Sequence, residues 1–294
     1  MKAVVFTLGC KVNEAESGSI MAALEKLGFE VTDSLCPADI YVLNTCAVTC
    51  EAEKKSRQLI ARVRKFNGNA DIFVCGCASE KDKKSFEARG VTFVCGARDK
   101  GKIVEAVALK FNLFNCGLQQ PKQTGTRAFI KVQDGCNNFC SYCIIPYLRG
   151  REISRSIEDI LGEIAKTDCP EIVLNGINIS SYGYGDKTLT DLISALSKEK
   201  KRIRRLVSLE FNIITEEFLE ALKKLPDFAE QFHLSLQSGS NAVLKAMNRR
   251  YTREEYLEKC ALIYKYFPDA AITTDIIAGF ATETEEDFEK SLSI

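Results

Sequence analysis

The sequence contains one histidine, His233, and equal numbers of basic and acidic residues, 40 of each. A single histidine leaves no His-based catalytic triad, and we expect His233 to be a packed or hydrogen-bonded strand residue. The balanced charge gives no general indication of nucleic-acid binding. The N-terminal segment MKAVVFTLGC has an apolar run of only six residues, so it predicts a first strand and neither a signal peptide nor a membrane span.

Cysteine is abundant, with 13 in 294 residues, but its pattern is not that of a disulfide framework. The count is odd, and the chain is far longer than disulfide-stapled domains. We therefore predict a reducing, cytoplasmic location, with cysteines that are metal ligands or small buried hydrophobic residues. A zinc ribbon needs two CxxC pairs, and the second pair is lacking: one residue separates Cys75 from Cys77, and three separate Cys46 from Cys50. Zinc remains the alternative metal.

Three further cysteines, Cys136, Cys140 and Cys143, lie in the string GCNNFCSYCIIPYLRG. Spacings of three residues and then two are typical of iron-sulfur sites rather than zinc sites. A 4Fe-4S cluster ordinarily takes four thiolates, so a group of three leaves one iron without a protein ligand. Because an open coordination position is where a small molecule binds, the string predicts a cluster that also holds a cofactor or substrate.

From Lys2 to about Gln120, short apolar runs alternate with amphipathic helices. One helix is predicted to begin at Asn13, with Glu16 as the partner in a capping box, and to end at Gly28. The pattern indicates a doubly wound α/β domain with a parallel sheet. Its predicted strands are AVVFTL, DIYVLN, DIFVCG and VTFVCG.

Three cysteines of this domain come just after predicted strands: Cys10, Cys46 and Cys77. The carboxyl ends of parallel strands form the binding crevice of an open α/β sheet, so separate strands can bring these thiolates to one place. Buried structural cysteines are the alternative. Cys50 and Cys75 are competing ligands, and we prefer Cys77 to Cys75 because the backbone can bend toward the crevice beyond the strand.

The stretch CGLQQPKQTGTR predicts a linker, so we expect one domain at 1–120 and a second at 121–294. In the second domain, five predicted strands alternate with helices, one of which begins with a Thr252/Glu255 capping box. This order indicates a partial TIM-type (βα) barrel, with its chemistry at the carboxyl ends of the strands. A barrel of this type needs a sixth strand, so we expect the chain to be truncated at its C-terminus.

Local charge is less even than the total. Basic residues gather in the run KEKKRIRR, residues 198–205, and along a predicted helix at about 52–66. Either run predicts a basic surface that would suit nucleic acid, and an ordinary solvated helix face is the alternative for each.

With both cysteine groups placed, the chain resembles the methylthiotransferase branch of the radical S-adenosylmethionine (SAM) enzymes along nearly its full length. GCKVN followed by Glu is similar to the tRNA N6-threonylcarbamoyladenosine methylthiotransferases of MtaB type. The isopentenyladenosine enzymes more often show GCQMN, and the ribosomal-protein enzymes show GCPKN. The motifs that carry the resemblance are LGCKVNEAES, LNTCAVTCEAEKKSRQ, VCGCASE, QDGCNNFCSYCIIPYLRG and HLSLQSGSNAVLKAMNRRYT.

This resemblance implies two 4Fe-4S clusters and SAM as cofactors. The SAM-cleaving cluster would be bound by Cys136, Cys140 and Cys143, and the auxiliary cluster by Cys10, Cys46 and Cys77. No side chain is assigned a catalytic role, because the cofactors supply the reactivity. Ordinary strand-end structure is the alternative for each residue of the implied SAM pocket, which comprises Tyr142, Gly176, Asn178, Glu210, Gln237 and Ile277.

The implied reaction is insertion of a methylthio group at C2 of N6-threonylcarbamoyladenosine 37 of tRNA. This base lies in the anticodon loop, where extrusion costs about a few kcal/mol. We further expect a monomer without membrane attachment, an electron donor such as a flavodoxin or ferredoxin, and no C-terminal RNA-binding TRAM domain. The alternatives are an enzyme for isopentenyladenosine 37 or for a ribosomal protein, and an inactive metal- or RNA-binding fragment.

Overall fold

The computed structural model describes residues 1–121, 123, 125–198 and 202–294, and the chain divides into two compact units. The first unit comprises Met1–Gln123 and Tyr147–Arg149; the second comprises Thr124–Pro146 and Gly150–Ile294. Both units are α/β, each with parallel strands and covering helices, as the alternation of apolar runs and amphipathic helices predicts. In the described part of the chain, no helix is long and apolar enough to cross a membrane.

The first unit is built on a five-stranded sheet in the order β2-β1-β3-β4-β5, and all of its pairs are parallel. Every residue of the central strand β3, which reads IYVLNT, is buried, because helices cover both faces of the sheet. The doubly wound parallel sheet is therefore confirmed. The strands are β1 (Lys2–Thr7), β2 (Glu30–Thr32), β3 (Ile40–Thr45), β4 (Asp71–Gly76) and β5 (Phe93–Val94).

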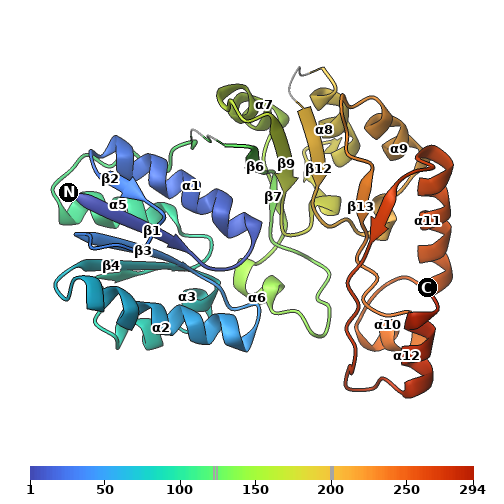
Figure 1. Ribbon diagram of the computed structural model, residues 1–294, viewed down its shortest axis with the longest axis horizontal. Helices are drawn as coiled ribbons and strands as arrows, with labels where there is room; N and C mark the ends of the chain where they lie inside the picture. The colour runs from blue at the N-terminus through green and yellow to red at the C-terminus, as the bar shows by residue number, and fades with distance from the viewer. Residues whose placement is uncertain (122, 124, 199–201) are drawn as a thin grey trace. The chain divides into compact units, whose positions relative to one another are not determined.

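Helices α1 and α5 lie on one face of this sheet, and α2 and α3 lie on the other (Figure 1). On the first face, Ile20 and Leu24 of α1 pack with Ile103 and Val107 of α5 against side chains of β1, β3 and β4. This packing places the strand ends, with their cysteines, along one edge of the sheet. The helices are α1 (Lys11–Lys26), α2 (Cys50–Phe66), α3 (Cys77–Lys81), α4 (Lys83–Glu87) and α5 (Gly101–Lys110).

The prediction that α1 begins at Asn13 with a capping box is wrong. The helix begins at Lys11 with Cys10 as its N-cap, and the Cys10 side chain makes no capping hydrogen bond. Asn13 is buried, and its amide donates to the carbonyl oxygens of Leu8, at 2.8 Å, and Thr45, at 3.2 Å. The Asn13 side chain therefore bonds to the backbone at two strand ends and does not cap the helix.

The second unit has five parallel strands in sequence order. One sheet has the order β12-β9-β6, and β13 pairs with β14. A parallel bridge between Leu209 and Leu234 joins the chain beyond β12 to the chain beyond β13. Within the described residues the strands form an open arrangement and not a closed barrel. The strands are β6 (Arg127–Lys131), β9 (Glu171–Asn175), β12 (Arg202–Leu206), β13 (Gln231–His233) and β14 (Ala271–Thr273).

The outer helices of this unit run alongside the strands in Figure 1 and cover one large apolar core. The Thr252/Glu255 capping box is confirmed at the start of α11. His233 is a hydrogen-bonded strand residue as predicted, with Nδ1 at 3.0 Å from Thr273 Oγ1. The outer helices are α7 (Ile157–Lys166), α8 (Leu189–Leu196), α9 (Glu216–Lys223) and α11 (Arg253–Tyr266).

Candidate functional site

The cysteine loop of the second unit lies between β7 (Gln133–Asp134) and α6 (Ile145–Arg149). It contains Phe139 at a φ of 49°, a left-handed conformation that costs about 1–3 kcal/mol for a bulky residue. The guanidinium of Arg151 lies 4.7 Å from the centre of the Phe139 ring. Backbone strain of this kind is typical of functional loops that their surroundings hold in place.

The loop is held by a segment that lies about a hundred residues later in the sequence, just after α10 (Asn241–Ala246). The Asn248 amide donates to the carbonyl oxygens of Phe139, at 2.9 Å, and Asn138, at 3.3 Å. Ser141 donates from its backbone N–H to Met247 O, at 3.0 Å. Three positions of the cysteine loop are therefore positioned by tertiary hydrogen bonds and not by the loop alone.

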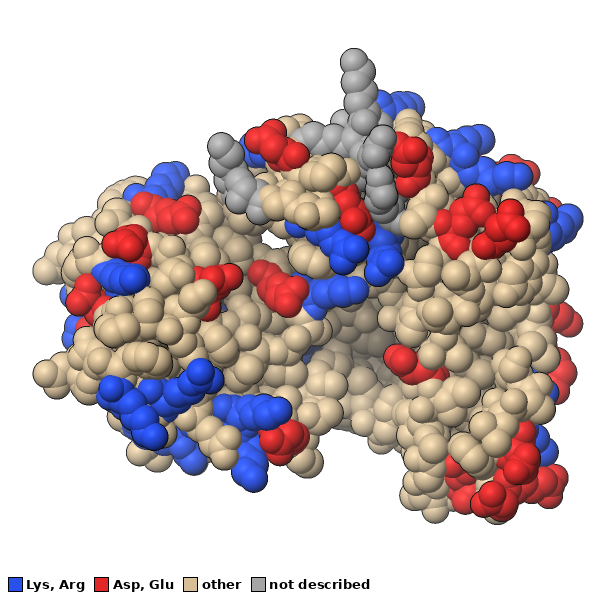
Figure 2. Space-filling model, in the orientation of Figure 1, with Lys and Arg blue, Asp and Glu red and all other residues tan. Residues whose placement is uncertain are grey.

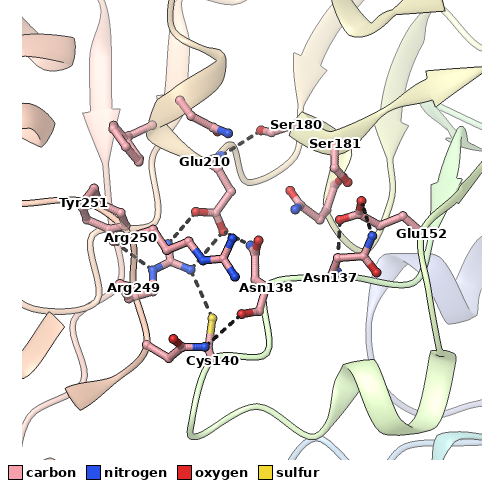
Figure 3. A pocket seen from close by; sticks show the side chains of 14 residues that line it. Asn137, Asn138, Cys140, Glu152, Ser180, Ser181, Glu210, Arg249, Arg250 and Tyr251 are labelled. Carbon is pink, nitrogen blue, oxygen red and sulfur yellow. Dashed lines mark hydrogen bonds and ion pairs between the residues drawn. The ribbon is translucent and has the colours of Figure 1, made fainter. Parts of the chain in front are cut away.

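A cavity of about 320 Å³ opens beside the loop (Figure 3). Its walls are polar: the Cys140 thiol on one side, Glu152 with Asn137 on another, and Asn178 and Glu210 after two of the strands. This volume is at the lower end of the range for cofactor sites, and hydroxyl, amide and charged groups converge on it. The cavity thus suits a small, polar, charged ligand that also contacts the thiol.

Arg249 and Glu210 form the charged centre of this cavity. Arg249 Nη2 lies 2.6 Å from Glu210 Oε2, and Arg249 Nη1 lies 3.1 Å from Glu210 Oε1. Arg249 Nη1 also donates to Cys140 Sγ at 3.5 Å, and the figure shows the guanidinium between the carboxylate and the thiol (Figure 3). Burial alone would lower the pKa of Arg249, but the Glu210 carboxylate has the opposite effect, and the net shift is upward. Arg249 is therefore a fixed cation beside the thiol.

The predicted SAM-pocket residues divide into two groups. Asn178 and Glu210 line the cavity, whereas Tyr142, Gly176, Gln237 and Ile277 are not among its lining residues. Gln237 and Ile277 instead make a backbone pair, with Ile277 N–H donating to Gln237 O at 2.9 Å. Tyr142 is 40% exposed, and burial of the rest of the side chain raises the pKa of its hydroxyl. Roles for all six in binding SAM stay predictions.

Gly176 contributes indirectly, through Gln133. A Cβ at Gly176 would lie 3.0 Å from Gln133 Oε1. That oxygen accepts from the Asn178 N–H at 2.9 Å, and Gln133 Nε2 donates to Gly135 O at 2.8 Å. The buried Gln133 therefore ties Asn178 to the start of the cysteine loop. Gln133, Asn248 and Arg249 are not predicted as site residues from the sequence. Asn248 and Arg249 belong to the NRR string of the motif HLSLQSGSNAVLKAMNRRYT, which is the one signal that could have found them.

In the first unit, Cys10, Cys46 and Cys77 lie at the carboxyl ends of β1, β3 and β4, which are neighbours in the sheet. Cys46 and Cys77 are buried, and Cys10 is exposed. The Ser56 hydroxyl on α2 holds the Cys46 backbone: it accepts from Cys46 N–H at 3.2 Å and donates to Cys46 O at 3.1 Å. The three cysteines therefore follow neighbouring strands at one edge of the sheet, and their convergence on one site stays a prediction.

Two glycines allow these strand ends to approach closely. Gly76, at a φ of +108°, precedes Cys77, and a Cβ there would overlap the backbone of Thr45. A Cβ on Gly9, which precedes Cys10, would lie 2.9 Å from Cys46 Sγ. At both glycines, therefore, the turn that leads into a cysteine packs against the end of the adjacent strand so closely that only a hydrogen atom fits as a side chain.

The competing cysteines occupy different surroundings. Cys75 belongs to the apolar core of the first unit, and burial raises the pKa of its thiol to about 12. Cys50 is exposed as the first residue of α2. These positions favour Cys77 over Cys75, because a protonated thiol enclosed by apolar side chains is not available as a ligand.

Across the described ranges, no group of three or more His, Cys, Asp and Glu residues is arranged as a formed metal site. The donor sets nevertheless fit iron-sulfur clusters, since each supplies three thiols, from one loop or from three adjacent strand ends. Their assignment as ligands stays a prediction.

Comparison with protein families matches residues 130–293 to the radical SAM superfamily and residues 2–96 to the uncharacterized protein family UPF0004. The threonylcarbamoyladenosine tRNA methylthiotransferase MtaB of Chlamydia pneumoniae is 41% identical over 98% of this chain and 70% of its own length. Its Bacillus subtilis counterpart is 36% identical over 98% of this chain and 69% of its own length. A tRNA-2-methylthio-N(6)-dimethylallyladenosine synthase of Thermotoga petrophila is 37% identical over all of this chain and 71% of its own length.

Among solved structures, the cobalamin-dependent SAM radical enzyme OxsB with aqua-cobalamin bound is similar over the whole chain, with a TM-score of 0.69. The sequence identity is 14%, so this likeness shows the fold alone. The chain spans about half of that solved protein, 52% of its length.

Proposed function

We propose that this chain, which belongs to the radical SAM superfamily and to its methylthiotransferases, inserts a methylthio group into tRNA. The proposed target is C2 of N6-threonylcarbamoyladenosine 37. The chain is thus an enzyme, a transferase, of a superfamily that uses SAM and a 4Fe-4S cluster. The observation that carries the proposal is the 41% identity to an MtaB over 98% of the chain, together with GCKVN at residues 9–13.

In the second unit, Cys136, Cys140 and Cys143 would hold the SAM-cleaving cluster. When bound, the cluster and SAM supply the one-electron chemistry that an inert C2–H bond requires and that no side chain provides. The chain's own residues bind and orient. Arg249 keeps a positive charge 3.5 Å from Cys140 Sγ, and Glu210 offers a carboxylate in the same cavity. Such a pair complements the amino and carboxylate groups of an amino-acid ligand.

In the first unit, Cys10, Cys46 and Cys77 would hold a second, auxiliary cluster. Their placement after three adjacent strands supports this proposal, as does the close packing at Gly9 and Gly76. The exposed Cys10 thiol leaves one side of the set open to solvent, which a site that passes sulfur to a large substrate needs.

The proposed partners are the anticodon loop of tRNA and an electron donor such as a flavodoxin or ferredoxin, with the chain acting as a monomer. Basic side chains gather over α2 in Figure 2, including the exposed Lys54, Lys55, Arg62 and Lys65. Some basic side chains of this helix are paired, for example Arg57 with Glu53 at 2.5 Å. The other predicted basic run, 198–205, falls mostly on residues and side chains outside the described ones.

The test is a comparison of nucleosides. The chain is reconstituted anaerobically with iron and sulfide and incubated with SAM, dithionite and tRNA that carries N6-threonylcarbamoyladenosine 37. We expect mass spectrometry to detect the 2-methylthio product, together with 5'-deoxyadenosine. The Cys140→Ala variant should form neither compound. An unchanged tRNA with active SAM cleavage would contradict the proposed substrate.

A second candidate substrate is dimethylallyladenosine 37, because the Thermotoga petrophila relative carries that name at 37% identity. The same assay with tRNA that carries dimethylallyladenosine separates the two. Product from this tRNA alone would favour the second candidate, and a methylthiolated ribosomal protein with unchanged tRNA would exclude both.

A further inference from the structure

Arg149 is the largest fully buried side chain in the described part of the chain, and it lies in the first unit. In this part of the sequence, only the three residues Tyr147–Arg149 belong to the first unit. The residues before and after them belong to the second unit. The guanidinium donates to Asn13 Oδ1 at 2.6 Å, and to Glu16 Oε1 at 3.0 Å and Oε2 at 3.1 Å. Asn13 and Glu16 lie in the first turns of α1, directly after Cys10.

A second buried cation shares the same carboxylate. Lys100 is 3% exposed and forms an ion pair with Glu16 Oε2. Two cations and one carboxylate therefore lie together beneath the strand ends that carry the cysteines. Replacing such a buried ion pair by apolar residues of similar size is often neutral or stabilising, so stability alone is a weak reason for this arrangement.

The charges lie next to the predicted auxiliary thiols. Asn13, which accepts from Arg149, donates to Leu8 O at 2.8 Å, two residues before Cys10, and to Thr45 O at 3.2 Å, directly before Cys46. The positive charges of Arg149 and Lys100 also act on Cys77. The same two cations act on Cys75 deeper in the core. Two fixed cations thus lie beside the turns that carry the auxiliary cysteines, where they favour negative charge on sulfur.

We propose that Arg149 is a positioning residue of the auxiliary cysteine set: anchored by Asn13 and Glu16, it holds a fixed positive charge beside the thiols of this set. The inference rests on the proposed function, in which this set binds an iron-sulfur cluster. Hydrogen bonds to cluster sulfurs and nearby charge set the reduction potential, so Arg149 tunes the potential of the auxiliary cluster. Residues 136–149 then supply both the thiols of one set and the counter-charge of the other.

The test isolates the auxiliary site by combining Cys136→Ala, Cys140→Ala and Cys143→Ala in the full chain. This background should bind about four irons per chain after anaerobic reconstitution. Adding Arg149→Met should lower the equilibrium constant for cluster reduction about tenfold, because reduction adds negative charge. For a one-electron couple this corresponds to about 59 mV, measurable by a redox titration followed by electron paramagnetic resonance. Arg149→Lys should recover most of the loss, because it keeps the charge.

The matched control is Arg64→Met. Arg64 donates to three backbone carbonyl oxygens, those of Gly68, Ala70 and Gly90, at 2.7–2.8 Å. Its partners precede β4 and β5, at the opposite edge of the sheet from the thiols, so this variant should bind four irons at the unchanged potential. Thermal unfolding of the metal-free chains measures the purely structural cost of each substitution.

The outcomes separate the two levels of the proposal. An unchanged potential in the loaded Arg149→Met chain, or equal shifts in Arg149→Met and Arg149→Lys, would overturn the role of Arg149. If Arg149→Met loses its iron while the metal-free chain still unfolds at the parent temperature, and Arg64→Met keeps its iron, the role is supported. Equal loss of iron from Arg149→Met and Arg64→Met overturns it. Absence of iron from the parent background would instead contradict the auxiliary cluster, and with it the proposed function.

Discussion

The two units assemble a cysteine triplet in different ways. In the second unit, Cys136, Cys140 and Cys143 occupy one loop, so their spacing is visible in the sequence. In the first unit, Cys10, Cys46 and Cys77 follow three separate strands, and they lie at one edge of the sheet only because β1, β3 and β4 are neighbours. A local set depends on the loop being held in shape, whereas a dispersed set depends on the packing of the whole sheet.

The supports differ accordingly. In the second unit, Asn248 donates to the local loop, and the carbonyl oxygens of Ala246 and Met247 accept from Ser141 of the loop. In the first unit the support is close packing at Gly9 and Gly76, with the Arg149–Glu16–Asn13 network beneath. We therefore expect the first site to be sensitive to backbone volume and the second to be sensitive to lost donors.

The largest expected effect comes from removing one thiol of either set. The parent chain should bind about eight irons, and Cys10→Ala or Cys140→Ala should each leave about four. Cys10→Ala should keep SAM cleavage and abolish the methylthio product, whereas Cys140→Ala should abolish both. Iron analysis, 5'-deoxyadenosine release and nucleoside mass spectrometry measure the three quantities. Four irons in the parent, unaffected by Cys10→Ala, would leave only the site in the second unit.

Backbone volume in the first unit is tested by Gly76→Ala. A methyl group there would overlap Thr45 at a φ of +108°, so we expect the free energy of unfolding to fall by about 3 kcal/mol or more. The matched control is Gly90→Ala, since Gly90 also has a positive φ, +67°, but has nothing within 4 Å of the added methyl. That control should lose only about 1–2 kcal/mol. Urea unfolding of both variants measures the difference, and equal losses would argue against close packing as the support.

Lost donors in the second unit are tested by Asn248→Asp. Asp tolerates the φ of 58° at this position, but its carboxylate cannot donate to the carbonyl oxygens of Asn138 and Phe139. We expect the lost hydrogen bonds to destabilise the cysteine loop by about 1–3 kcal/mol. The rate of SAM cleavage should therefore fall, while the iron of the first unit is retained. Asn241→Asp, at the exposed start of α10, is the matched control. Unaltered SAM cleavage in Asn248→Asp would show that the loop holds its shape without these bonds.

The smallest expected effect is a pH dependence confined to the second unit. Hydrogen bonds from the hydroxyls of Ser240 and Thr284 lower the pKa of Asp287, in the capping box of α12 (Glu285–Leu292), to about 2. Because this pKa is depressed, the stabilisation is complete above the unfolded value of about 3.9 and is lost as the pH falls toward 2. Urea unfolding between pH 2 and 6 should show this loss, and Asp287→Asn should remove it. A slope that persists in Asp287→Asn would assign it to other carboxylates.

Much of the secondary structure and sheet arrangement can be predicted from the sequence, because interactions between neighbouring residues determine them. The alternation of apolar runs with amphipathic helices predicts the parallel sheets, and the Thr252/Glu255 pair predicts the start of α11. The placement of Cys10, Cys46 and Cys77 beyond strands also follows, because strand ends are visible where an apolar run stops. These signals need only neighbouring residues and the periods of helix and strand.

Tertiary structure alone decides which polar side chains serve the sites. The sequence predicts Asn13 as a helix cap, but in the structure it donates to Leu8 and Thr45. The sequence predicts Glu16 as the capping partner, but in the structure it forms ion pairs with Arg149 and Lys100. Arg249 reaches Cys140 from 109 positions away, and Asn248 reaches Phe139 from the same distance along the chain. A long polar side chain has many partners within reach, and the final packing of the backbone determines which of them lies at hydrogen-bonding distance.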